Sequence, residues 1–150
     1  MRLRPEQIRE LLGQLLGRAV HLHPVSEVHA DSNTFRGLVT ESNHLVAVVA
    51  GDLAFAHQSG AALAMVPNAM LEDINETTSQ DLLENYTEVA NVLSRLVNEA
   101  SKDRIRLDPG IVHDEEALQA IVDQNKTLAR WQADIEGYGT SHFGIWVKAA

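Results

Sequence analysis

Cysteine is absent from this 150-residue chain. Disulfides, iron–sulfur clusters and thiolate zinc sites are therefore excluded, which suits a reducing compartment, and we expect the protein in the cytoplasm. Long apolar runs are missing as well. The first apolar stretch is interrupted by Glu6, Arg9 and Glu10, whereas a signal peptide needs an unbroken apolar core and a membrane span needs about 20 apolar residues. We expect neither.

Basic residues are few: 12 Lys and Arg stand against 21 Asp and Glu, for a net charge of -9. Such a chain repels phosphate backbones and anionic lipid, so we expect no nucleic-acid or membrane partner. A protein surface that presents Lys or Arg is the better candidate. Hydrophobic residues make up 45% of the chain, which is normal for a packed globule, and we expect a single domain over residues 1–150.

The hydrophobic pattern alternates between helical and strand periodicity along the chain. Helical spacing follows Pro5 as far as Gly17, and Asp52 is placed to cap a nearly uncharged helix from Leu53 to Met65. Strand patterns and turn formers predict two hairpins. The expected elements are helices at 5–16, 53–65, 69–75, 79–101 and 115–124 and strands at 19–23, 35–40, 45–50, 104–107, 129–136 and 142–148. This order predicts an α+β fold, with a mainly antiparallel sheet, a long amphipathic helix and further helices packed on the sheet.

The helix expected from Ser79 to Ser101 has two distinct faces, with Thr77, Thr78 and Ser79 as candidate caps. Apolar residues occupy one side at helical spacing. At about 100° per residue, five polar residues gather within about 80° on the other side. We call this set the outer stripe, and its members are Glu84, Glu88, Asn91, Arg95 and Asn98. An ordinary solvent-facing side is one interpretation. Against it, Glu84 and Glu88 are like charges at i,i+4, which destabilises a helix by roughly 0.2–0.5 kcal/mol.

The segment from Glu84 to Asn91 resembles the signature helix of the CheC/CheX/FliY family of bacterial chemotaxis phosphatases. That signature has Asp or Ser, three residues, Glu, two residues, then Asn, and a Pro later in the chain; here Glu88 and Asn91 match the last pair. The order of helices and strands is also similar over nearly the whole chain. A single signature helix is present, as in CheX-like proteins, which pair as dimers.

The resemblance implies a CheX-like phosphatase that hydrolyses the aspartyl phosphate on the receiver domain of a response regulator. Asn91 would orient the attacking water, and Glu88 would pair with a partner Lys. Glu84, Arg95 and Asn98 share the stripe and are expected to contact the partner. No cofactor is implied, because Mg²⁺ would belong to the phosphorylated receiver. We also expect a homodimer, since sheet edges need covering.

The chain departs from the family pattern at three points. Glu84 replaces the first Asp or Ser, Arg95 stands where a small residue is common, and Pro109 follows Asn91 at a shorter distance than usual. These differences leave open a second hypothesis, a non-catalytic protein-binding module with the same fold.

His21 and His23 support a third hypothesis, a metal-dependent hydrolase, because alternate residues of a strand share a face. The sequence contains no comparable second cluster of ligands, so we interpret these histidines as surface or structural residues and expect no bound transition metal. Gly137 and Gly139 fit a hairpin turn better than a phosphate loop.

Overall fold

The computed structural model describes residues 3–108, 110 and 113–149. Its centre is one six-stranded sheet with strand order β1-β5-β6-β3-β2-β4, in which each pair of neighbours is antiparallel. The strands are β1 (Val20–Pro24), β2 (Arg36–Thr40), β3 (Leu45–Gly51), β4 (Ile105–Leu107), β5 (Thr127–Ile135) and β6 (Gly139–Val147). The expected α+β class and antiparallel sheet are confirmed.

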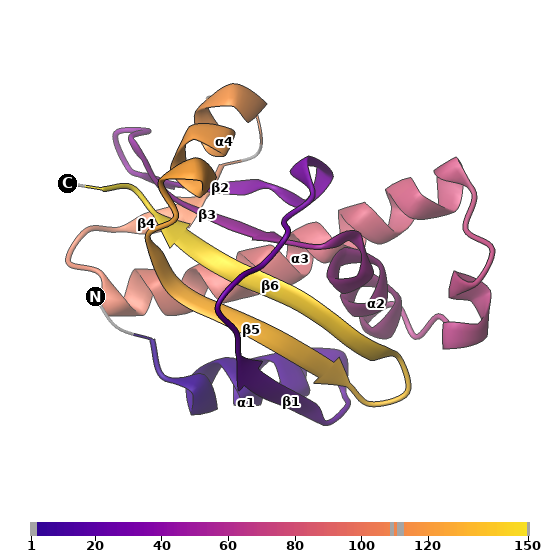
Figure 1. Ribbon diagram of the computed structural model, residues 1–150. Coiled ribbons are helices and arrows are strands. Elements are labelled where there is room, and N and C mark those ends of the chain that lie inside the picture. Colours follow the sequence, from indigo (N-terminus) through magenta and orange to yellow (C-terminus); the bar gives the residue numbers. More distant parts are fainter. Residues whose placement is uncertain (1–2, 109, 111–112, 150) are drawn as a thin grey trace.

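Helices cover both faces of the sheet (Figure 1). Three lie on one face: α1 (Pro5–Leu16), α2 (Leu53–Leu63) and α3 (Glu76–Ala100). The fourth, α4 (Glu115–Gln124), packs on β3 and β6 from the other face, where Trp146 is buried with Leu118 and Ile121. Two short 3₁₀ helices, η1 (Ser32–Thr34) and η2 (Asn68–Leu71), precede β2 and α3. Alternation along the central strands supplies both cores, since successive side chains point to opposite faces.

Local signals place most helix ends. Pro5 begins α1, Gly17 ends it with a φ of 65°, and the Asp52 carboxylate accepts a hydrogen bond from the Phe55 amide at 2.8 Å as the cap of α2. The expected start of α3 was wrong. Asn75 caps it through the Thr78 amide at 2.8 Å, so the helix begins at Glu76. An Asn side chain reaches the third helical amide as readily as Ser or Thr does, and here Asn75 is the residue with extended backbone.

Helix α2 packs directly against α3. A Cβ added at Gly60 would lie 2.3 Å from the Leu82 carbonyl oxygen, so only glycine allows this approach. The composition of α2 predicted close approach to the sheet, whereas the tightest contact is made with α3. Across the described residues, no helix is long and apolar enough to cross a bilayer.

Candidate functional site on helix α3

The inner face of α3 holds the outer stripe in a fixed position. Tyr86, Val89 and Leu93 are fully buried at its centre. The Tyr86 hydroxyl donates a hydrogen bond to the Thr34 carbonyl at 2.8 Å, and its ring meets Phe55 edge to face. Burial raises the pKa of the Tyr86 phenol well above its usual value, so it stays a neutral donor. A helix anchored in this way presents its outer residues with little freedom to move.

Three charged residues of the stripe are exposed: Glu84, Glu88 and Arg95. Within the described residues, none of them has an oppositely charged group within 4.0 Å. The like charges of Glu84 and Glu88 therefore stand one turn apart without a neutralising neighbour. Because Glu84, Glu88 and Arg95 form no ion pair with the described residues, their charges can pair with groups of a partner protein.

Asn91 lies between Glu84 and Thr87 around the helix and is half-buried. Its backbone carbonyl accepts a hydrogen bond from the Ser94 hydroxyl. Its side-chain carboxamide makes no hydrogen bond to any residue that the structure describes. An amide that is partly shielded from water yet carries unused donor and acceptor atoms can orient a ligand or a water molecule.

Asn98 differs from the other members of the stripe. Its carboxamide oxygen accepts a hydrogen bond from the Ile105 amide at 2.7 Å and so ties the end of α3 to the start of β4. This contact gives Asn98 a structural task, and its expected contact with a partner stays a prediction.

A cavity of about 340 Å³ lies beside the stripe, between α3, the start of β2 and the chain that follows β4. Thr87, one helical turn before Asn91, lines it together with Arg36, Asp108 and His113. The buried Asp108 carboxylate accepts hydrogen bonds from the amides of Gly110 and His113, which shapes the far wall. The cavity therefore borders the same side of α3 that carries Asn91. Pro109, the proline of the signature, lies outside the described residues.

Arg36 is the residue of this region that the sequence did not single out. Its Nε donates to the Thr87 hydroxyl at 2.9 Å, its Nη1 to the carbonyls of Asn33 and Phe35, and its guanidinium stacks on the Tyr86 ring at 5.1 Å. Loss of solvation on burial lowers the pKa of Arg36, and no described carboxylate lies within 4.0 Å of it. The sequence feature that could have identified Arg36 is its positive charge within the otherwise apolar run that forms β2.

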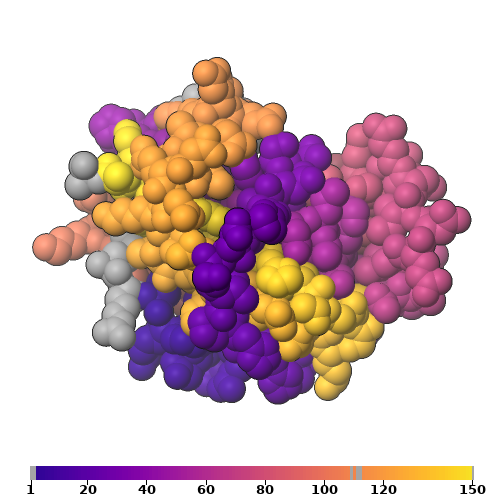
Figure 2. All heavy atoms as spheres, viewed as in Figure 1, coloured from indigo at the N-terminus to yellow at the C-terminus, as the bar shows by residue number. Residues whose placement is uncertain are grey.

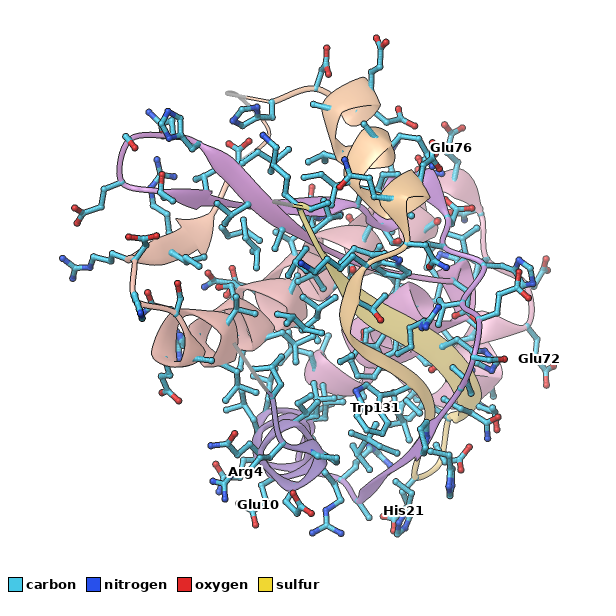
Figure 3. The ribbon with its side chains drawn as sticks, turned by 60° about the vertical axis from the view of Figure 1, so that its left-hand side comes forward. Arg4, Glu10, His21, Glu72, Glu76 and Trp131 are labelled. Atoms are coloured by element: carbon cyan, nitrogen blue, oxygen red, sulfur yellow. The ribbon has the colours of Figure 1, made fainter. Side chains whose placement is uncertain are left out.

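His21 and His23 lie on the edge strand β1, exposed to solvent, as His21 shows in Figure 3. The His23 Nε2 lies 3.2 Å from an Asp134 carboxylate oxygen. The Thr140 hydroxyl, more than this histidine, lowers the pKa of Asp134. Among the described residues no three His, Asp or Glu side chains gather in a metal-binding arrangement.

Comparison with known proteins identifies the fold but no sequence family. No family model and no curated protein matches the chain. Among solved structures, the middle domain of FliM from Vibrio alginolyticus aligns over 95% of this chain and 86% of its own, with 8% identity and a TM-score of 0.55. A FliM–SpeE complex and a FliG–FliM complex from H. pylori match at TM-scores of 0.51, with 12% and 10% identity, over 97% and 95% of this chain and 90% and 85% of theirs. At these identities the likeness concerns the fold alone, and it is consistent with the fold that the CheC/CheX/FliY resemblance implies.

Proposed function

We propose that this protein docks through the outer stripe of α3 on the receiver domain of a phosphorylated response regulator and hydrolyses its aspartyl phosphate. The observation that carries the proposal is the pair formed by Glu88 and Asn91. They lie one turn apart on α3, and with the described residues the exposed Glu88 carboxylate forms no ion pair and the half-buried Asn91 carboxamide no hydrogen bond. The fold around this helix is similar to that of the FliM middle domain.

Hydrolysis of the aspartyl phosphate requires the protein mainly to position the attacking water. An aspartyl phosphate is an activated acyl phosphate, so aligning one water for in-line attack supplies much of the acceleration. The Asn91 carboxamide accepts a hydrogen bond from that water and donates one to a phosphoryl oxygen. Glu88 pairs with a Lys of the receiver, and Glu84 and Arg95 contact its surface on either side. Mg²⁺ comes with the receiver, and the reaction takes place in the cytoplasm.

The test is phosphate release from receivers phosphorylated with acetyl phosphate, with wild type, Asn91→Ala and Glu88→Ala. Asn91→Ala should lose acceleration on the order of 10²-fold, because the water is no longer oriented. Its stability should change by about 0.5 kcal/mol or less, since the carboxamide makes no hydrogen bond to the described residues. Asn91→Asp keeps the shape but removes the amide donors, and it should be as inactive as Asn91→Ala.

Glu88→Ala should instead weaken docking, and the loss should shrink as salt rises, because screening removes the charge pair in wild type as well. Glu99→Ala is the matched control, since Glu99 is also exposed on α3 but lies three turns further along the helix. Equal effects of the two substitutions would argue against a specific contact at Glu88.

The second candidate is a non-catalytic binding module. FliM chains of similar fold were solved in a complex with FliG and in a complex with SpeE. The exposed Arg95, one turn beyond Asn91, also favours a surface with a different partner. Two results together would support the module and refute hydrolysis. Wild type would bind receivers without accelerating phosphate release, and Arg95→Ala would reduce affinity as much as Glu88→Ala does.

A further inference from the structure

The α2–α3 connection, residues 64–75, projects beyond the end of the sheet. It leaves α2, passes through η2 and returns to the first turn of α3 (Figure 1). In the space-filling view this segment and the start of α3 form a lobe at one side of the molecule (Figure 2). The lobe includes only the N-terminal end of α3, whereas Asn91 lies further along the helix.

Two methionines are held in solvent on this connection. Met65 is 83% exposed and Met70 is 63% exposed, the highest values for large apolar side chains among the residues that the structure describes. Met65 stands at the position where α2 ends, with a φ of 61°. Hydrogen bonds from the Met65 amide to the Ala62 carbonyl and from the Val66 amide to the Ala61 carbonyl complete a Schellman motif. Glycine is the usual residue there.

A methionine at this position neither packs against the core nor favours the backbone conformation. Its side chain points into water, and its backbone adopts the left-handed conformation that a side chain disfavours. Exposed flexible methionines are common on surfaces that bind partner helices, because the unbranched thioether adapts to varied apolar side chains.

The charges around the connection define what it can bind. From residue 37 to residue 94 the sequence has no Lys or Arg. Glu72, Asp73 and Glu76 are all exposed, and Figure 3 shows Glu72 and Glu76 pointing away from the body of the molecule. None of the three forms an ion pair within the described part of the chain. The charged side chains of the connection and of the first turn of α3 are thus all acidic. The cation Arg18 stacks on the ring of Tyr138, whose hydroxyl donates a hydrogen bond to the Val66 carbonyl.

We propose that the α2–α3 connection is a docking surface for a basic amphipathic helical segment of another protein. Apolar side chains of that segment contact Met65 and Met70, and its Lys or Arg side chains pair with Glu72, Asp73 and Glu76. This surface is separate from the outer stripe, and the inference does not depend on hydrolysis of an aspartyl phosphate.

The test uses a fluorescent synthetic peptide of Leu and Lys, patterned to form an amphipathic helix, and a second peptide in which every Lys is Glu. Titration with the full-length protein, followed by fluorescence anisotropy, should show saturable binding of the Lys peptide alone. The double substitution Met65→Ser and Met70→Ser should weaken binding by about tenfold, because both apolar contacts are lost.

Charge removal has a matched control on another helix. The triple substitution Glu72→Gln, Asp73→Asn and Glu76→Gln should weaken binding by about tenfold and flatten its salt dependence. The same number of charges is removed on α4 by Glu115→Gln, Glu116→Gln and Asp123→Asn, residues that are also exposed, and this variant should bind as wild type does.

Three results would overturn the proposal: no saturable binding of the Lys peptide, equal loss in the two charge variants, or unchanged affinity in the methionine double variant. Circular dichroism of each variant establishes that the fold is intact. The dephosphorylation assay is independent of these titrations, so failure of the phosphatase proposal and failure of this one are distinguishable.

Discussion

Replacing Met65 by glycine should make the protein more stable, although it deletes an apolar side chain. Met65 follows the last turn of α2 with a φ of 61°. A left-handed backbone places Cβ too close to the following carbonyl oxygen in any residue except glycine. Because the side chain is 83% exposed, its removal sacrifices little buried surface.

Two terms set the size of the effect. Relief of the left-handed strain stabilises the native state by roughly 1–2 kcal/mol. Glycine also increases the conformational entropy of the unfolded chain, which lowers the stability gain by about 0.5–1 kcal/mol. The net gain is therefore about 0–1.5 kcal/mol, and for a chain of this size that raises Tm by up to about 6 °C.

The assay is thermal unfolding followed by circular dichroism, with Met70→Gly as the control. Met70 is also exposed, but it lies in η2 without a positive φ. Glycine there relieves no strain and only increases the freedom of the unfolded chain, so Met70→Gly should lower Tm. The two substitutions delete the same side chain and should have opposite signs.

A fall in Tm for Met65→Gly as large as that for Met70→Gly would refute the reasoning. It would mean that the left-handed conformation carries no strain at this position, or that the Met65 side chain contributes to packing. In either case the argument that Met65 is kept for binding would lose its physical basis.

Three further predictions concern stability and assembly. Gly60→Ala should destabilise the fold by about 1–3 kcal/mol in urea unfolding, because the new Cβ would lie 2.3 Å from the backbone of α3; an unchanged midpoint would contradict the tight α2–α3 contact. His57 donates or accepts a hydrogen bond with the Ser79 hydroxyl at 2.8 Å, and desolvation lowers its pKa despite the opposing charge of Asp31. The folded state thus binds fewer protons at His57 than the unfolded state, so this contribution to stability is complete above about pH 6.5 and decreases as pH falls towards the lower folded pKa. His57→Gln should make the unfolding free energy less dependent on pH between about 5 and 7, and an identical pH profile would count against this role. Light scattering should show a homodimer, since β1 and β4 end the sheet within the described residues; a monomer at micromolar concentration would weaken the analogy with CheX.

The sequence predicted features that depend on near neighbours. Helical spacing marked the buried side of α3, where Tyr86, Val89 and Leu93 are packed as expected. The Asp52 cap and the end of α1 at Gly17 follow from the chemistry of single residues and were placed correctly. Exposure of Glu84 and Glu88 follows from the same periodicity. These predictions succeed because the period of a helix and the geometry of a cap are set within a few residues.

Strand order belongs to the tertiary structure. Strand β1 pairs with β5, more than a hundred residues away in the chain, and not with the hairpin that follows it. The structure also shows that the members of the outer stripe differ in their hydrogen bonds. Asn98 is engaged with Ile105 across the turn to β4, whereas Asn91, with the same side chain on the same side of the helix, has no such bond to the described residues.

The sequence by itself determined that α3 is amphipathic, that its outer side carries Glu88 and Asn91, and that the chain between residues 37 and 94 has no Lys or Arg. Only the tertiary structure decided what surrounds them. The bond from Arg36 to Thr87 and the cavity beside them join β2, α3 and the chain after β4. The left-handed Met65 depends on how α2 must end to return towards α3. The physical reason is that contacts between distant segments depend on which apolar faces pack together, and many sequences with the same local periodicity could pair those faces differently.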